Sequence, residues 1–203
     1  MSRLLPLFPL QLVVFPGSVI PLHIFENRYR EMVGEAGRNG TEFGIVLARE
    51  GGIVNAGCTV AVEAVTKTYS DGRFDVLTRG RRRFRITSID QEKDYLRGEV
   101  EFFDDEDLTP PGDDLIRKAI EAARELGESA EPIDPGKPFL SFRLADPVED
   151  LEFRSVLQTT RSETERLTKI VGFLKTYAVK REYAGKMRQV AGTNGFGHKP
   201  ADL

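Results

Sequence analysis

The chain has 203 residues, 40% of them hydrophobic, which is enough to bury a core as one domain or two small lobes. Its 29 lysines and arginines are balanced by 32 aspartates and glutamates, so it lacks the basic excess typical of nucleic-acid-binding domains. No apolar run reaches the roughly 18–20 residues that span a bilayer, and a single cysteine excludes an intramolecular disulfide, so we expect a cytoplasmic protein with no membrane segment.

The apolar N-terminus is interrupted by prolines. Proline fixes φ and removes a hydrogen-bond donor, so a central strand that runs through all of them is not expected. The pattern predicts a short strand from Gln11 to Phe15, a turn at Pro16-Gly17 and a second extended piece ending at Pro21-Leu22. The four prolines are Pro6, Pro9, Pro16 and Pro21.

A short amphipathic helix is predicted directly after this segment, from about Asn27 to Ala36. Its apolar residues recur at helical spacing on one face, and Gly37 suits the left-handed position that ends many helices. These apolar residues are Phe25, Tyr29, Met32 and Val33.

The chain from about residue 43 to residue 102 carries strand patterns. Phe43 to Ala48 is a nearly continuous apolar run, typical of a strand buried on both faces. Val60 to Ala64, residues 83–87 and residues 96–102 alternate apolar and polar, and Ser70-Asp71-Gly72 suits a hairpin turn. Five or more strands at this spacing favour a rolled or barrel-like antiparallel sheet.

Asp104–Gly112 ends the strand pattern with charge, proline and glycine, so we place a lobe boundary there and expect the acidic residues 104–107 to form a solvated loop. Helices are predicted from Asp113 or Asp114 to Gly127 and from Asp146. The longest helix begins at Ser162-Glu163-Thr164-Glu165, which fits a capping box. Its apolar stripe is Leu167, Ile170, Val171, Leu174, Tyr177 and Ala178. Residues 192–203 lack periodicity and are expected to be a disordered tail.

Several of these segments together resemble the amino-terminal domain of the Lon protease family, which also occurs in stand-alone Lon-domain proteins. The resemblance implies an α+β fold: a PUA-like rolled β-sheet with one helix over residues 1–108, then a helical lobe over residues 109–191. It also marks Glu26, Arg28, Tyr29, Gly80 and Arg83 as structural motif positions. The matching segments are Leu5–Pro9, Val14–Gly17, Pro21–Glu26 with Arg28-Tyr29, Gly57–Ala61, Asp71–Arg73, and Gly80 with Arg83-Phe84.

The resemblance implies binding of unfolded or partly folded polypeptides, with an ATP-dependent protease or chaperone as a candidate partner. No nucleotide-binding loop supports an ATPase here, because Pro135-Gly136-Lys137-Pro138 has proline where the Mg²⁺-binding hydroxyl belongs. The proteolytic Ser-Lys unit of full-length Lon would lie in a further domain. We therefore expect a non-catalytic module without a cofactor.

Polypeptide binding requires exposed apolar surface, and three apolar segments are flanked by proline or glycine. We expect them to line a groove between the two lobes, the alternative being ordinary core packing. The candidate binding residues are Phe8, Phe15, Pro16, Phe139, Leu140 and Phe142.

Two other functions stay open. A PUA-like fold with clustered arginines could bind RNA, although strand alternation places Phe84 in the core and acidic residues flank the cluster. A pocket between the lobes could instead serve a small enzyme. The arginines are Arg79, Arg81, Arg82, Arg83 and Arg85.

Metal binding is not expected, because one cysteine and two histidines cannot supply a structural zinc site. Cys58 with His23 as base is conceivable as a nucleophile, but a buried small residue at a strand start is the favoured interpretation. We also expect Glu26 to pair with Arg28 or Arg83 and so to fasten the first helix to the sheet.

Overall fold

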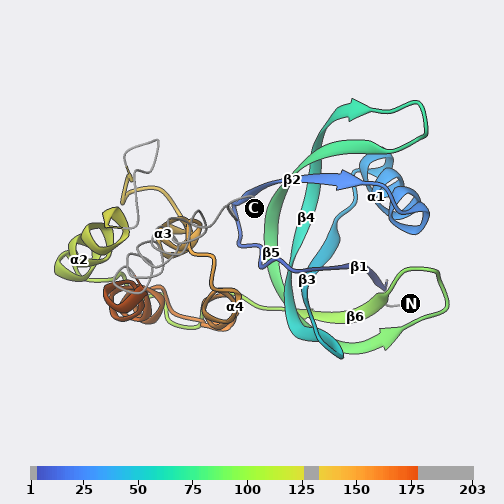
Figure 1. The fold of residues 1–203 in the computed structure, drawn as a ribbon. Helices are drawn as coiled ribbons and strands as arrows, with labels where there is room; N and C mark the ends of the chain where they lie inside the picture. Colours follow the sequence, from blue (N-terminus) through green and yellow to red (C-terminus); the bar gives the residue numbers. More distant parts are fainter. Residues whose placement is uncertain (1–3, 126–132, 178–203) are drawn as a thin grey trace, which may run out of the picture.

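The computed structural model describes residues 4–125 and 133–177, and it divides into a sheet with one helix and a group of further helices (Figure 1). The predicted stop at Gly127, Ala178 of the last helix and the predicted tail at 192–203 lie outside the described residues. A last helix runs through residues 163–177. The other elements are β1 (Leu5–Leu10), β2 (Val19–Ile24), α1 (Asn27–Asn39), β3 (Phe43–Arg49), β4 (Gly52–Thr68), β5 (Phe74–Asp90), β6 (Arg97–Phe102), α2 (Asp113–Arg124), α3 (Leu140–Ala145) and α4 (Leu151–Thr159).

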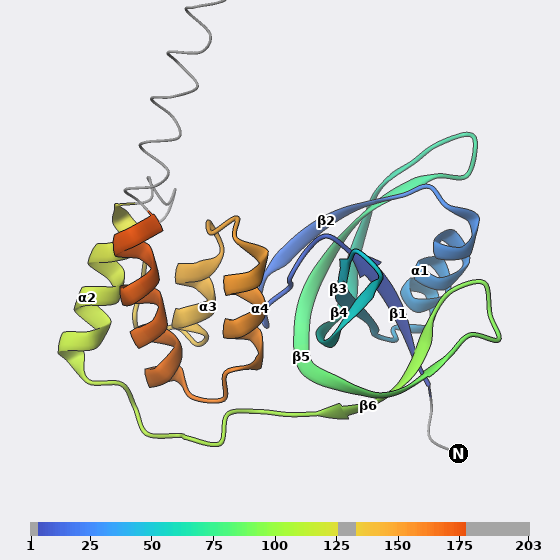
Figure 2. The ribbon, with the colours of Figure 1, turned by 60° about the horizontal axis from the view of Figure 1, so that its bottom comes forward.

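The six strands form one sheet in the order β2-β5-β4-β3-β1-β6, and β6 also pairs with β5. This second pairing closes β1, β3, β4, β5 and β6 into a barrel, while β2 pairs with β5 alone (Figure 2). All pairs are antiparallel except β1 with β3, which the chain joins by a crossover through β2 and α1. The predicted barrel-like sheet is confirmed, with one parallel pair added.

Three of the four prolines lie within strands and Pro16 lies in the predicted turn, whereas the predicted strand from Gln11 to Phe15 is wrong. Pro6 and Pro9 belong to β1 and Pro21 to β2. Pro6 pairs only with β6 and Pro9 only with β3, and β2 has one neighbour. A strand tolerates proline wherever the edge that loses its N–H has no partner, so three prolines fit these two strands.

Helix α1 buries its predicted apolar face but ends later than predicted. Gly37 remains helical because it packs beside Val62 of β4, where an added Cβ would lie 3.7 Å from a methyl carbon. Gly40 takes the left-handed conformation with φ 61°, and its N–H bonds to the carbonyl oxygen of Ala36. Phe25, which was assigned to the apolar face, lies before the helix and is 58% exposed. The buried residues are Tyr29, Met32, Val33 and Ala36.

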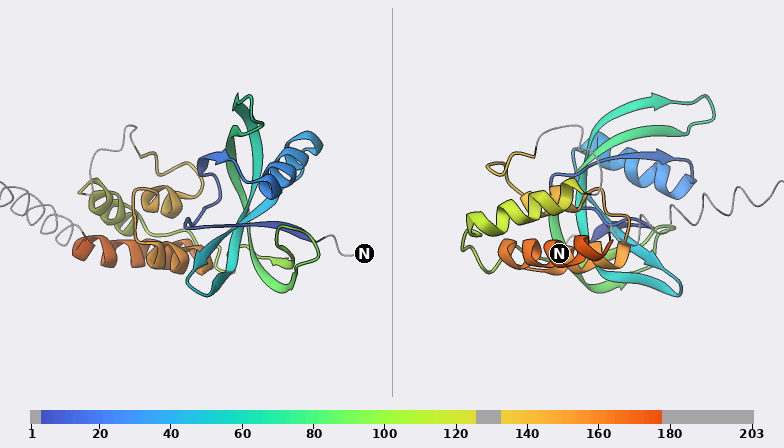
Figure 3. Two further views of the ribbon diagram at one scale, coloured as in Figure 1. Left: turned by 45° about the vertical axis from the view of Figure 1, so that its right-hand side comes forward. Right: turned by 60° about the vertical axis from the view of Figure 1, so that its left-hand side comes forward.

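The helices after β6 gather at one end of the barrel (Figure 3). The start predicted at Asp146 is wrong, because that carboxylate accepts a hydrogen bond from Ser18 and lies beside Arg154. Asp150 caps α4 instead by accepting the N–H of Phe153 at 2.9 Å. The predicted cap at Ser162 is confirmed, since its hydroxyl accepts the N–H of Glu165. None of the described helices is long and apolar enough to cross a membrane.

The helical core draws two side chains from the far end of the sequence. Val13 and Phe15, in the loop between β1 and β2, are buried in the same cluster as the helices. A separate cluster fills the space between α1 and the barrel, with Phe43 and Ile45 fully enclosed. The loop between β1 and β2 therefore belongs to the helical core, although the strands on either side of it belong to the sheet.

Candidate functional site

Strands β1 and β2 do not pair with one another (Figure 1). A cavity of about 620 Å³ is lined by residues from both strands. The end of β1 supplies Phe8–Leu10 and β2 with the following turn supplies Pro21–Glu26. Arg28 and Tyr29 of α1 and Leu96 before β6 complete the lining. We call this cavity the β1–β2 groove, and most of its lining is apolar.

The β1 side of the groove is a free strand edge. Leu7 donates its N–H to the carbonyl oxygen of Leu96 at 2.8 Å, on the side of β1 away from β3. Backbone groups alternate between the two edges of a strand, so Pro9 is directed to that same side, where β6 no longer pairs with β1. Pro9 has a carbonyl oxygen but no N–H, so this edge offers an acceptor only.

The β2 side is a free edge of the same kind. Gly80 of β5 donates its N–H to the carbonyl oxygen of Ser18 at 2.9 Å, so its backbone is directed toward β2. The β2–β5 register has no shift, so Thr78, which lies opposite Ile20, is directed the same way. The backbone of Pro21 is therefore directed away from β5, at the edge that borders the groove. The missing N–H of this proline again falls where no strand neighbour exists.

The floor of the groove is aromatic. Phe8 stacks on Tyr29 with ring centroids 4.1 Å apart, and each residue is 6% exposed. Burial raises the pKa of Tyr29, and the guanidinium of Arg28 lies 4.6 Å above its ring. Phe8 was predicted to be displayed on the surface; it forms a mostly buried floor, because α1 packs its Tyr29 ring against it.

The charged groups of the groove are already paired. Arg28 donates to Glu26 at 2.9 Å, so the predicted partner Arg28 is confirmed. The pair lies within three residues and both side chains are about half-exposed, so it does not fasten the helix to the sheet as expected. His23 Nδ1 lies 2.5 Å from Asp75 Oδ1, and this hydrogen bond lowers the pKa of Asp75. The groove consequently carries little uncompensated charge.

The groove predicted between the lobes is closed where Phe15 meets Phe142, whereas Phe139 and Leu140 line a cavity of about 740 Å³ between the segment after β6 and the helices. Phe15 and Phe142 stack at 4.7 Å, and they are 0% and 2% exposed. Pro16 and Leu140 are also buried, because α3 forms where the sequence predicted an apolar surface loop. Phe139 alone among the six candidate binding residues is well exposed, at 46%, in a left-handed conformation with φ 61°.

Buried arginines join the sheet to the helices. Arg83 of β5 and Arg166 of the last helix donate to Asp105 at 2.6 and 2.7 Å. Burial opposes ionisation of Asp105, but the hydrogen bonds from Arg166 and Arg83 bring its pKa below the ordinary value. The solvated loop expected for residues 104–107 is wrong at Asp105, because the helices cover the side of β5 that carries Arg83.

Arg154 and Gln158 of α4 hold the loop between β1 and β2, and the sequence did not point to either. Arg154 donates to the carbonyl oxygen of Val13 at 2.9 Å, and Gln158 donates to that of Val14 at 2.7 Å. The guanidinium of Arg154 also lies 4.6 Å from the Phe15 ring. The one sequence feature that could have indicated this contact is that Arg154 lies one helical turn before the apolar Leu157.

Gly80, a motif position, allows the same loop to approach β5. A Cβ added at Gly80 would lie 2.0 Å from the carbonyl oxygen of Phe15, a distance that no side chain tolerates. Gly17 donates its N–H to the Gly80 carbonyl oxygen at 2.9 Å. Only glycine permits this contact between backbones.

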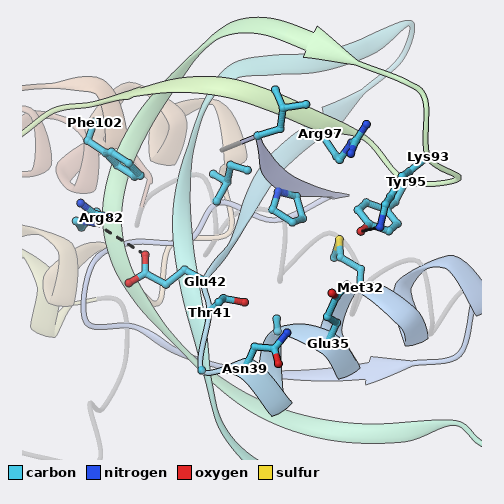
Figure 4. A pocket seen from close by; sticks show the side chains of 15 residues that line it. Met32, Glu35, Asn39, Thr41, Glu42, Arg82, Lys93, Tyr95, Arg97 and Phe102 are labelled. Carbon is cyan, nitrogen blue, oxygen red and sulfur yellow. Dashed lines mark hydrogen bonds and ion pairs between the residues drawn. The ribbon is translucent and has the colours of Figure 1, made fainter. Parts of the chain in front are cut away.

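A second cavity, of about 450 Å³, lies between the end of α1 and β6 and is more polar (Figure 4). Arg82 and Glu42 point toward one another across it, with 3.9 Å between Nε and Oε2. Lys93 donates to the Tyr95 hydroxyl at 3.0 Å on the opposite side. Charged side chains make this cavity less suited to apolar ligands than the β1–β2 groove.

The predicted arginine cluster is not a continuous basic surface. Arg83 is buried, and Arg79 forms an ion pair with Glu63. The guanidinium of Arg82 lies 3.8 Å over the Phe102 ring. Phe84 is fully buried, which confirms its predicted place in the core.

Nucleophilic and metal chemistry find no support in the described parts of the chain. Cys58 is fully buried as predicted, but it lies within β4 and not at a strand start, and burial raises its pKa to about 12. Its thiol donates to the carbonyl oxygen of Thr59, and His23 is engaged by Asp75. Among residues 4–125 and 133–177, no three His, Cys, Asp or Glu side chains gather as a metal site would require.

A closed barrel with one helix packed against it, and a helical part that holds the loop between its first two strands, define an α+β domain. The family described as the ATP-dependent protease La (LON) substrate-binding domain matches residues 4–176. The chain belongs to this family.

Solved structures and curated relatives agree with this assignment. The Lon N-terminal domain protein of Xanthomonas campestris is 28% identical, with a TM-score of 0.67 over 84% of this chain and 98% of that one. The N-terminal domain of Lon protease from the Mycobacterium avium complex, 17% identical with a TM-score of 0.56, shares the fold over 85% of this chain and 98% of that one.

Two relatives named Lon protease 2, from Syntrophobacter fumaroxidans and Myxococcus xanthus, are each 27% identical. These alignments cover 54% and 51% of this chain but only 14% and 13% of the relatives, so the chain matches a small part of those longer proteins.

Proposed function

We propose that this chain is a non-catalytic module that binds polypeptide segments, and that the β1–β2 groove is its binding site. One observation carries the proposal: an open apolar cavity of about 620 Å³ lies between two unpaired strand edges in a member of a substrate-binding domain family. Large exposed apolar patches mark interaction sites, and extended peptides are commonly recognised at free sheet edges.

The chemistry of the groove favours a polypeptide over a small charged ligand. Phe25, at the rim, is 58% exposed, and Leu22 and Leu96 line the walls. The nearby ion pair of Glu26 with Arg28 leaves little net charge to attract an anion or a cation. The partners we propose are unfolded or partly folded chains, handled together with an ATP-dependent protease or chaperone in the cytoplasm.

The other two candidate functions have weaker support. RNA binding needs clustered, uncompensated positive charge, whereas Arg83 is buried and Arg79 is paired with Glu63. An active site between the lobes would need open space where Phe15 stacks on Phe142.

The proposal is tested with a permanently unfolded protein. Fluorescence anisotropy of labelled α-lactalbumin, reduced and carboxymethylated, should rise with the concentration of this chain, whereas native α-lactalbumin should give no change. The variant Phe139→Ser removes the one exposed candidate outside the groove and should bind like the unchanged chain. Absence of binding to the unfolded form would overturn the proposal.

A further inference from the structure

We propose that the β1–β2 groove receives an extended polypeptide segment as an additional strand on the free edge of β2, with one uncharged apolar side chain inside the cavity. This inference rests on the proposed function and adds to it the mode of binding and the kind of segment bound.

The backbone of β2 defines what the segment must supply. Val19, Pro21 and His23 alternate with the residues that face β5, so their backbone groups are directed to the groove edge. Val19 and His23 offer both an N–H and a carbonyl, whereas Pro21 offers a carbonyl oxygen alone. Pro9 offers another lone carbonyl across the groove. An incoming strand must therefore donate more hydrogen bonds than it accepts, and its residue opposite Pro21 must keep its N–H.

The same proline disfavours pairing between two copies of this edge. In the register that places Pro21 opposite Pro21, neither chain has an N–H to donate at the centre of the pair. Proteins use proline on free edges to prevent such self-association. The edge thus discriminates between a copy of itself and a segment that carries ordinary amides.

The cavity selects the side chain that enters it. The stacked rings of Phe8 and Tyr29 form an apolar floor, and Phe25 stands exposed at the rim. The polar side chains at the rim already have partners: Glu26 contacts Arg28 and His23 is hydrogen-bonded to Asp75. A charged side chain would lose its hydration here without gaining a partner, so aliphatic and aromatic side chains are favoured.

The position of the bound segment is tested by photo-crosslinking. Cys58, the only cysteine in the sequence, is fully buried, so a new surface cysteine can be labelled selectively. We would label Phe25→Cys at the groove and Val65→Cys on β4 with a benzophenone maleimide; the original side chains are both 58% exposed. Reduced, carboxymethylated α-lactalbumin should crosslink several times more through position 25. Equal yields, or more through position 65, would overturn the assignment of the site.

The mode of binding is tested by an N-methyl scan. The probe is the tightest binder among overlapping 12-residue peptides of α-lactalbumin, methylated at one backbone nitrogen at a time. Because a strand turns every second amide to its neighbour, affinity should fall about tenfold or more at alternate positions and little at the others. A uniform or aperiodic profile would overturn strand addition, even if crosslinking places the peptide in the groove.

These results separate the two proposals. If the unfolded protein does not bind the unchanged chain, the proposed function fails and this inference fails with it. If it binds but crosslinks elsewhere or shows no alternation, the function stands and only this inference is lost.

Discussion

Aromatic residues near proline occur both in the β1–β2 groove and in the contact between barrel and helices. One of them, Phe25, is exposed in the groove, whereas Phe15 is buried in the contact. In the contact, Phe15 is fully buried between the Phe142 ring and the guanidinium of Arg154. In the groove, Phe25 is 58% exposed and lies just after β2, the strand that carries Pro21. Aromatic residues near proline therefore do not by themselves mark a binding surface. Such a residue is buried or exposed according to whether a segment from elsewhere in the chain packs over it.

The largest difference in stability between the two regions is expected when the phenylalanine of each is truncated to alanine. Phe15→Ala should lower the free energy of unfolding by about 3–5 kcal/mol, because it leaves a cavity in the helical core. Phe25→Ala should change it by less than about 0.5 kcal/mol, since its ring is largely in solvent. Urea denaturation followed by circular dichroism measures both. Similar effects for the two variants would contradict the contrast.

The second prediction concerns the charge that joins the sheet to the helices. Asp105→Asn should cost about 3 kcal/mol, because Arg83 stays buried without a carboxylate and Arg166 keeps only Glu163 as an acidic partner. Asp104→Asn, at the exposed neighbouring position, should change stability little.

The stability difference between the unchanged chain and Asp105→Asn should depend on pH, because the fold lowers the pKa of Asp105. Its pKa in the folded chain lies below the ordinary value, so the carboxylate stabilises the fold fully above about pH 4. As the pH falls from there through the folded-state pKa, that stabilisation is lost. Urea titrations of the unchanged chain and Asp105→Asn should therefore converge in acid. A gap that stays constant down to pH 2 would contradict the assigned role.

A smaller loss is expected where the loop of the contact meets the barrel. Gly80→Ala places a Cβ against the carbonyl oxygen of Phe15 and should cost about 2 kcal/mol through a backbone shift. The control is Gly52→Ala, because an added Cβ there meets nothing within 4 Å. Thermal unfolding compares the two, and equal melting temperatures would show that the close approach is not needed.

The smallest effect is expected at the groove rim. Glu26→Ala removes a half-exposed pair with Arg28 and should change stability by less than about 0.5 kcal/mol. A loss above 1 kcal/mol would instead restore the idea that Glu26 fastens α1 to the sheet. Differential scanning calorimetry resolves these alternatives.

Local patterns predicted the elements whose cause is local. The Asp71-Gly72 turn, the cap at Ser162 and the α1 face formed by Tyr29, Met32 and Val33 appear as predicted, because neighbouring residues determine them. The α+β fold and the family were reached from motif segments rather than from periodicity. The end of α1 was misplaced because Val62, far along the chain, gives Gly37 a packing role.

The candidate site could not be predicted because its determinants are relations between distant segments. Alternation along β5 placed Arg83 on the opposite face to Phe84, but only the helices beyond residue 113 turn that face into an interior. Likewise, Phe142 suggested surface display until α3 and Arg166 enclosed it. The prolines were informative in another way: Pro9 and Pro21 mark strand edges that remain without a neighbour.

The parallel pairing of β1 with β3, and its pairing with β6, has a consequence for biosynthesis. Within this domain β1 (Leu5–Leu10) is synthesised before both of its partners, and β6 is complete only at Phe102; the core around Phe15 is complete only after the later helices. The apolar side chains of β1 and Phe15 therefore lack part of their native contacts until those later strands and helices have been synthesised. Folding is governed by closure of long loops, and ribosome-bound fragments that stop before β6 should remain sensitive to protease.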